Sequence, residues 1–236
     1  MLKQRFFDQK IAVTLLFFGL AFVLLSVVIF HECRNLAIGE AEKNLAGFLM
    51  THRAIRSFVE DVQKPEIYRL KREKRLYEEY FSPRLLSSTF IARNVKDAQN
   101  RERRSLGLDE LYFKFASGNP RNPINQADAD ELNLLRKFNQ GEMIEYKSVV
   151  NRGGVSALYY ALPISPNRDS CMLCHGNPAD APRELVDQYG DKAGFYEKNG
   201  EIRALMSVRI PLAGLLAGAR RTAMLLAFVA FVLLGL

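Results

Sequence analysis

Cysteine and histidine are both scarce in this chain, which has three of each among its 236 residues. A structural zinc site needs two closely spaced pairs of ligands, and the sequence has only one such pair, which excludes a zinc module. Residues 31–210 contain no internal repeat and no low-complexity tract. The composition, 48% hydrophobic and 25% charged, is that of a globular domain and excludes wholesale disorder.

Charge is missing from two stretches. Residues Ile11–Phe30 contain no charged side chain, and roughly 20 apolar residues in a helix span a bilayer core of about 30 Å. A cleaved signal peptide is the alternative, but this run is longer than a signal core and lacks a small-x-small cleavage site. We therefore expect a retained transmembrane helix. The second stretch, Thr222–Leu236, stops without a charged flank.

The charge distribution around these stretches predicts a topology. Basic residues precede the first helix, which places the N-terminus in the cytoplasm and the following segment in the periplasm of a bacterial inner membrane. Because the second stretch is short, we expect the chain to be cut within a membrane helix of a longer protein with a cytoplasmic output domain; a natural tail anchor is the alternative. The expected parts are the cytoplasmic N-terminus, transmembrane helix 1, the periplasmic domain and the membrane-return helix, at residues 1–10, 11–30, 31–210 and 211–236.

Two of the three cysteines and one of the three histidines lie in a single motif, Cys171-Met172-Leu173-Cys174-His175. Cys-x-x-Cys-His is the attachment sequence of c-type haem. The two thiols add to the two vinyl groups of the porphyrin, and the adjoining imidazole ligates the iron. The motif therefore predicts one covalent haem c on Cys171 and Cys174, with His175 as the proximal ligand and Met172 and Leu173 beside the haem.

Two other functions fit a Cys-x-x-Cys pair. A disulfide between Cys171 and Cys174 is compatible with an oxidising compartment. A thioredoxin-like redox pair would open a helix directly after a strand of a βαβ unit. The sequence before the motif, Leu162–Ser170, is loop-like and disfavours that second alternative.

The second axial position of the iron needs a partner. Apolar residues recur at helical spacing after the first membrane helix, at Ile38, Ala41, Leu45, Phe48, Ile55, Val59 and Val62. His52 lies on the same stripe, and we expect it to be the distal ligand, with Phe48 and Ile55 against the haem. A histidine that only fills the core, the thiolate of Cys33, and a methionine (Met50 or Met143) are the alternatives. Cys33 precedes His52 by about 28 Å of helix, so the two cannot serve one iron.

The rest of the chain predicts an α+β fold, with a long N-terminal helix and an antiparallel sheet. The helix should end near Lys64–Pro65, because the residue before proline disfavours helix. Asn151–Gly154 predicts a hairpin turn, and a capped helix is expected over Asp128–Asn139. The four predicted strands are Leu111–Ala116, Met143–Val150, Val155–Leu162 and Ile202–Ile210.

Two basic runs, Arg69–Arg75 and Arg93–Arg104, resemble nucleic-acid-binding segments. An exported domain meets no nucleic acid, so we interpret both runs as solvated faces near the membrane surface. Arg53 and Arg56 lie within a turn of His52 and are candidates for contacting the haem propionates.

Four segments resemble a known family, the PAS-like periplasmic c-haem sensor domains at the N-termini of bacterial histidine kinases, diguanylate cyclases and chemotaxis receptors. The resemblance lies in HRAIRSFVEDVQKPEIY (His52–Tyr68), YFSPRLLSSTFIARNV (Tyr80–Val95), FASGNPRNPINQADADE (Phe115–Glu131) and CMLCHGNPADAP (Cys171–Pro182). The resemblance implies a PAS-like fold, haem on Cys171 and Cys174 with His175 proximal, and sensing of redox state or a diatomic gas.

Three functions compete at this point. The leading prediction is a membrane-anchored sensor, a homodimer through its long first helix, that signals across the membrane in response to a small gaseous ligand or a redox partner. The alternative is a membrane-anchored monohaem cytochrome for periplasmic electron transfer. A peroxidase-type enzyme ranks third, because no acid–base pair stands out near His52.

Overall fold

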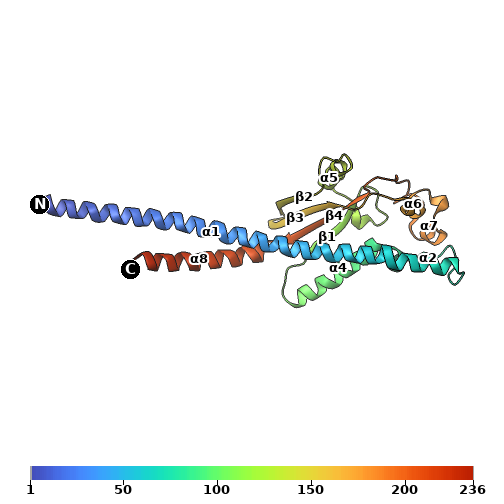
Figure 1. Cartoon of the computed structure of the whole chain (residues 1–236), viewed down its shortest axis with the longest axis horizontal. Helices are drawn as coiled ribbons and strands as arrows, with labels where there is room; N and C mark the ends of the chain where they lie inside the picture. The colour runs from blue at the N-terminus through green and yellow to red at the C-terminus, as the bar shows by residue number, and fades with distance from the viewer. Residues whose placement is uncertain (1, 236) are drawn as a thin grey trace. The chain divides into compact units, whose positions relative to one another are not determined.

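The computed structural model describes residues 2–235, and the side chains of residues 10–233 except Arg152. The chain forms two compact units. One unit holds the residues up to Lys43 together with those from Leu212 onward, and the other holds Asn44–Pro211. Figure 1 labels the helices and strands of both.

The first unit contains the N-terminal part of helix α1 (Leu2–Phe58) and helix α8 (Ala213–Gly235). By length and composition, two described helical stretches can cross a membrane, and their most apolar 18-residue windows have mean hydropathies of 2.9 and 1.7. The rings of Phe22 and Phe231 meet edge to face with centroids 5.5 Å apart. The two apolar helices expected from the sequence are therefore present.

The helical path through the second unit continues past the predicted end at Lys64–Pro65. A π-helical turn, η1 (Val59–Gln63), follows α1, and helix α2 (Lys64–Arg72) follows that turn. Pro65 lies in the first turn of α2, where the amide hydrogen that proline lacks has no intrahelical partner in any case. The prediction that the helix ends at this proline is wrong, because the π turn absorbs the change of register.

Two further helices connect α2 to the sheet, α3 (Pro83–Leu86) and α4 (Ser88–Ser105). Ser87 caps α4, since its hydroxyl accepts a hydrogen bond from the Phe90 amide at 3.2 Å. Near the other end, the buried Asn100 side chain makes two hydrogen bonds of 2.9 Å with the backbone of Leu111. These bonds fix α4 to the start of the sheet.

The sheet has four antiparallel strands in the order β1-β4-β3-β2. Strands β2 and β3 form the predicted hairpin, in which Gly153 and Gly154 have φ angles of +61° and +80°. Two successive residues with positive φ match the twist of a tight hairpin and favour glycine. The strands span Tyr112–Ser117, Tyr146–Arg152, Val155–Pro163 and Ala204–Pro211 for β1 to β4.

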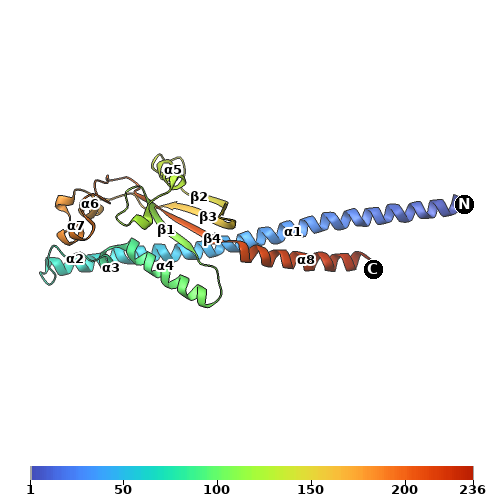
Figure 2. The ribbon, with the colours of Figure 1, turned by 180° about the vertical axis from the view of Figure 1, so that it is seen from behind.

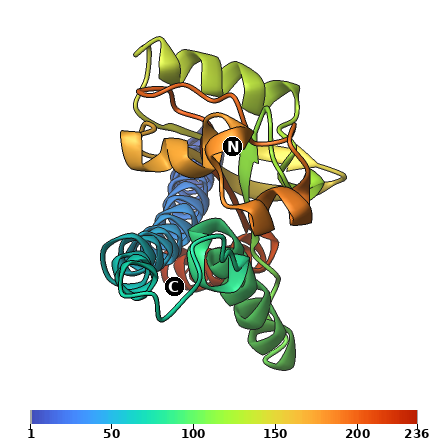
Figure 3. The same ribbon diagram turned by 90° about the vertical axis from the view of Figure 1, so that its right-hand side faces the viewer.

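Helix α5 (Ala129–Asn139) covers one face of the sheet, and the final turns of α1 lie with α4 on the other (Figures 2 and 3). Asp128 caps the start of α5, as the sequence predicts, and Glu131 completes a capping box with it. The core on this face is formed by side chains of α5, of the residue Ala127 that precedes it, and of three strands: Ala116, Ala127, Leu134, Leu135, Phe138, Tyr159, Ala161 and Leu205. The α+β class, the long first helix and the antiparallel sheet are confirmed.

The buried ion pair between Lys114 and Glu131 generates a stability prediction. Their charged atoms lie 2.8 Å apart, and the two side chains are 14% and 1% exposed. Replacing Lys114 with Met leaves the Glu131 carboxylate buried without its cation, which should lower the free energy of unfolding by about 3 kcal/mol. Urea denaturation measures this loss. Replacing the exposed Lys192 with Met is the control, and equal stability of the two variants would contradict the prediction.

Candidate functional site

The Cys-x-x-Cys-His motif lies on helix α6 (Asp169–His175), between β3 and β4. Residues three apart share a face of a helix, so the helix presents the free thiols of Cys171 and Cys174 on one side. Gly176 ends the helix, and a side chain there would clash, since a Cβ atom would lie 2.6 Å from the Met172 carbonyl oxygen. Local helix geometry therefore presents both thiols together and places the imidazole directly after them.

The His175 ring is held in one tautomer. Its Nδ1 lies 2.8 Å from the carbonyl oxygen of Gly194, and a carbonyl only accepts hydrogen bonds, so Nδ1 carries the proton and Nε2 has a free lone pair. Burial, with the nearby Arg203 cation, lowers the pKa of His175. A neutral imidazole with a free Nε2 is the form that binds iron.

A cavity of about 830 Å³ lies beside the motif and has Cys171, Cys174 and His175 in its wall. Helices α6 and α7 (Arg183–Tyr189) lie at the same end of this unit as α2 (Figures 1 and 2). The remaining wall comes from the last turn of α1, η1, α2, the α3–α4 region, one face of the sheet and loop segments that include residues 119–122 and 164–168. The volume falls within the range of roughly 300–1,000 Å³ typical of small-molecule and cofactor sites.

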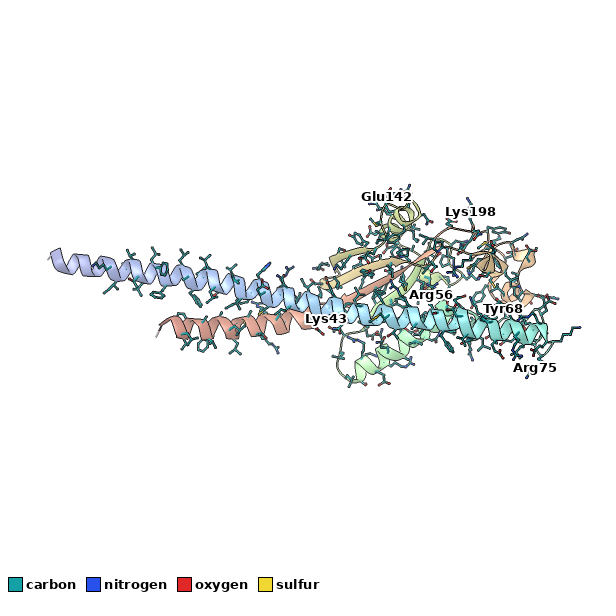
Figure 4. All side chains as sticks on the ribbon, in the orientation of Figure 1. Lys43, Arg56, Tyr68, Arg75, Glu142 and Lys198 are labelled. Atoms are coloured by element: carbon teal, nitrogen blue, oxygen red, sulfur yellow. The ribbon has the colours of Figure 1, made fainter. Side chains whose placement is uncertain are left out.

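The cavity has an excess of positive charge. Seven described residues in its wall are cationic and three are acidic. Arg56, labelled in Figure 4, lies over the Phe115 ring at 5.4 Å, and its Nε is buried without a hydrogen-bond partner within the described part of the chain. Burial lowers the Arg56 pKa, and the neighbouring Arg203 adds to this effect. An unpaired buried guanidinium favours an anionic group in the cavity.

Arg121 ties the motif to a distant segment. Its guanidinium lies 4.5 Å from the centre of the Phe195 ring and donates hydrogen bonds to the carbonyl oxygens of Gly194, at 3.0 Å, and Cys174. Gly194 has a φ of +71°, and a Cβ atom there would lie 2.6 Å from the Arg121 Cγ. Glycine is therefore required at the point where His175 and Arg121 share one carbonyl.

The structure brings together three of the eight cofactor-binding residues predicted from the sequence. Cys171, Cys174 and His175 share the cavity wall. The described wall does not include the other five: Leu173 is exposed, Met172 and Ile55 are half-buried, and His52 and Phe48 are buried elsewhere.

His52 is fully buried one helical turn before Arg56. Its ring lies 4.2 Å from the Phe48 ring and 4.4 Å from the Phe113 ring, measured between centroids. Neither ring nitrogen has a hydrogen-bond partner within the described part of the chain. Burial, together with the Lys96 charge, lowers the His52 pKa to about 4, so the imidazole is neutral. The described cavity wall reaches Arg53, the next residue on α1, but does not include His52 itself.

None of the alternative ligands considered from the sequence is among the described residues of the cavity wall. Cys33 is buried and belongs to the first unit. Met50 is 64% exposed, and Met143 packs on the α5 side of the sheet. The thioether that does line the cavity is that of Met206 on β4, which sequence reasoning missed because a strand methionine is an ordinary core residue.

Sequence reasoning also missed the residues that support His175. The segment Asn119–Asn122 lines the cavity and had a signal, since it belongs to one of the segments that carry the family resemblance. Gly194, Glu197 and Arg203 had no local signal, because only the fold brings them to α6. Among the described residues, no three of His, Cys, Asp and Glu form a group able to hold a metal ion alone.

The fold and the site define an α+β domain in which a helix-borne Cys-x-x-Cys-His motif lines a positively charged cavity. The Tll0287-like family model matches residues 34–211, so the chain belongs to the Tll0287-like family. Among solved structures, the chain is similar to that of the cyanobacterial heme protein Tll0287, with 17% identity, a TM-score of 0.47, and coverage of 73% of this chain and 95% of that one. A search of curated proteins found no match.

Arg121 generates a second stability prediction. Replacing it with Met keeps the contact with the Phe195 ring and removes the hydrogen bonds to Gly194 and Cys174. Hydrogen bonds from a charged donor contribute about 1.5–3 kcal/mol each, and relief of the buried charge offsets part of that. We expect the free energy of unfolding to fall by about 2 kcal/mol in chemical denaturation.

The matched control is replacement of Arg183 with Met. That side chain is 81% exposed and lies 3.8 Å from Asp187, an ion pair that contributes little. If the Arg121 and Arg183 variants unfold at the same denaturant concentration, Arg121 does not support the motif.

Proposed function

We propose that this domain binds one c-type haem through Cys171 and Cys174, with the Nε2 of His175 as the proximal ligand of the iron. The observation that carries the proposal is the convergence of both thiols and this imidazole on one cavity of about 830 Å³. The porphyrin supplies four of the ligands of the iron, so an axial imidazole is sufficient from the protein side and no larger metal-binding cluster is needed.

The residues in the cavity wall suit a haem. Phe115, Leu185 and Met206 offer apolar surface to the macrocycle. The unpaired Arg56 guanidinium suits a propionate carboxylate, and the overall positive charge suits two of them. When bound, the haem supplies a redox-active iron that also takes up diatomic gases.

His52 is the proposed distal ligand. Two features support it: the imidazole is fully buried and both of its nitrogens lack partners in the described residues, whereas buried polar groups are normally hydrogen-bonded. For His52 to bind the iron, one of two rearrangements is needed. Either the His52 ring leaves its position against Phe48 and Phe113, or the haem reaches one helical turn beyond Arg56.

In this proposal the haem domain is a PAS-like periplasmic sensor of redox state or a diatomic gas that signals to a cytoplasmic output. Support comes from connectivity, since α1 includes both the apolar segment 11–30 and the cavity residue Arg56, and β4 ends directly before α8. A homodimer through α1 belongs to the same proposal, because Met50, Phe58 and Val62 are exposed apolar residues along this helical path.

One observation favours electron transfer as the second candidate function. Arg53, Ser57 and Glu60 line the cavity and are exposed, so the cavity opens to solvent along α1 and η1. A haem whose edge is reached through that opening exchanges electrons with an external partner. A full gene that encodes no signalling domain would support electron transfer, whereas a full gene that encodes one would favour the sensor.

Covalent attachment is tested on protein expressed with a cytochrome c maturation system. We expect haem staining to survive denaturing electrophoresis, because thioether bonds persist when the fold is lost. The pyridine haemochrome should show the band of a haem with two thioethers. Replacing Cys171 or Cys174 with Ala should move this band to that of a single thioether, and replacing both should abolish the staining.

Cys33→Ala is the matched control for these variants, because this third thiol belongs to the other unit. The control should stain like the wild type. If the wild type carries no haem after denaturation, or if the double Cys171 and Cys174 variant still does, covalent attachment at this motif is wrong.

The distal assignment has its own test. Replacing His52 with Leu preserves most of the side-chain volume and removes the imidazole, so we expect a six-coordinate, low-spin haem to become high-spin and to bind CO readily. Absorption spectra of the ferric and ferrous protein measure the change, and circular dichroism checks that the fold survives. Met50→Leu is the control, since the exposed Met50 should leave the spectra unchanged. A His52 variant that stays low-spin would refute His52 as the ligand.

A further inference from the structure

The segment that precedes β4 runs along the C-terminal end of α6. The Gly194 carbonyl oxygen lies 2.8 Å from the His175 Nδ1, and two backbone amides of the same segment bond to the helix end. The Tyr196 amide donates to the Gly176 carbonyl at 2.9 Å, and the Glu197 amide donates to the His175 carbonyl at 3.0 Å. Backbone hydrogen bonds therefore fix Glu197 next to His175, whatever its side chain does.

The Glu197 carboxylate is buried beside the imidazole. Its side chain is 8% exposed, and Oε1 lies 3.6 Å from the His175 Nδ1. The other oxygen, Oε2, accepts a hydrogen bond of 3.3 Å from the Asn167 side chain and lies 3.7 Å from the Arg203 Nε. The carboxylate thus faces the Nδ1 edge of the ring, away from the Nε2 that is left for the iron.

Two acceptors compete for the one N–H of His175. The Gly194 carbonyl is close enough for a hydrogen bond, whereas 3.6 Å to Glu197 is beyond that range. Glu197 therefore acts on the imidazole mainly as a nearby negative charge in a partly desolvated place. A small rotation of the ring would exchange the neutral acceptor for the charged one.

We propose that Glu197 is a positioning residue for His175 that sets the reduction potential of the iron. This inference rests on the proposed haem site. A carboxylate at the Nδ1 edge increases electron donation from Nε2, and a negative charge stabilises the ferric form, which carries one more positive charge than the ferrous form. Taking up one electron from a reductant is therefore less favourable, and the potential is lower than that of the same haem without Glu197.

Arg203 has the opposite influence. It is the cation nearest the Glu197 carboxylate in the described ion pairs. Its charge also lowers the pKa values of Arg56, Arg121 and His175. Its 3.7 Å approach to Oε2 is not a hydrogen bond, so it compensates the carboxylate only in part. Removing Arg203 should leave the iron in a more negative surrounding and lower the potential further.

A structural role for Glu197 is the competing explanation. The other two acids in the described cavity wall are fully engaged on exposed helix surface: Glu60 pairs with Lys64 at 2.7 Å, and Asp61 accepts a hydrogen bond of 2.6 Å from Ser57. Glu197, in contrast, is buried and makes one long hydrogen bond to Asn167. A carboxylate kept only for stability would have closer partners, since burying a charge is costly.

The test is spectroelectrochemical titration of the full haem-loaded chain in detergent. Glu197→Gln keeps the shape and removes the charge, and we expect reduction to become about tenfold more favourable, an upward shift of about 59 mV for a one-electron couple. Arg203→Met should shift the potential downward. Glu197→Asp keeps the charge and should keep the potential close to that of the wild type. If packing rather than charge set the potential, the shorter Asp side chain would shift it as well.

Glu201→Gln is the matched control, because it removes the same charge from an exposed position four residues away and should leave the potential unchanged. A Glu197→Gln potential equal to that of wild type, with intact haem spectra, would overturn the inference and leave the haem site standing. Shifts of the same sign for Glu197→Gln and Arg203→Met would also overturn it. Absence of covalent haem from the wild type is a different outcome, which removes the proposed function itself.

Discussion

The hydrogen bond between the His175 Nδ1 and the Gly194 carbonyl is the contact on which the site depends. It selects the tautomer that leaves Nε2 available, and it joins α6 to a segment 19 residues further along the chain. The same carbonyl accepts from Arg121, and the Asn119 side chain bonds to the backbone of Gly194 and Phe195 at 3.1 and 3.0 Å. The motif is thus held by the end of β1 and by the approach to β4, and its geometry requires the folded sheet.

The packing of α1 on the sheet determines how far the cavity extends. Successive turns of α1 carry Phe48, His52 and Arg56. The Phe113 ring of β1 contacts both Phe48 and His52, and the Phe115 ring lies under Arg56. From His52 to Arg56 the helix advances about 6 Å, and from Phe113 to Phe115 the strand advances about 6.8 Å, so helix and strand stay nearly in step over this one turn. The wall therefore changes from aromatic packing at His52 to an open, charged cavity at Arg56 within one turn.

Local signals in the sequence predicted those parts of the protein that local physics decides. The capping residue Asp128 marked the start of α5, the turn Asn151–Gly154 marked the hairpin, and the spacing within the motif placed Cys171, Cys174 and His175 together. The proline rule failed at Pro65, because a π turn offers a way to continue the helix that the sequence does not display. Gly194 and Glu197 act on His175 across 19 and 22 residues of chain, and no periodicity or motif records such contacts. Arg121 lies in a segment that carries the family resemblance, but its bond to the Cys174 carbonyl, 53 residues away, has no local signal.

The two sides of the proposed iron site differ in how firmly they are built. The proximal side has a defined tautomer, a shared carbonyl and a charged residue behind the ring. On the other side, His52 is buried with neither nitrogen bonded among the described residues, and an unsatisfied buried group costs about 1–3 kcal/mol. An imidazole with no hydrogen bond to its second nitrogen loses no such bond when it is exchanged as a ligand. Electron transfer favours two fixed ligands, whereas a sensor needs one that can be displaced, so this asymmetry supports sensing as the proposed function.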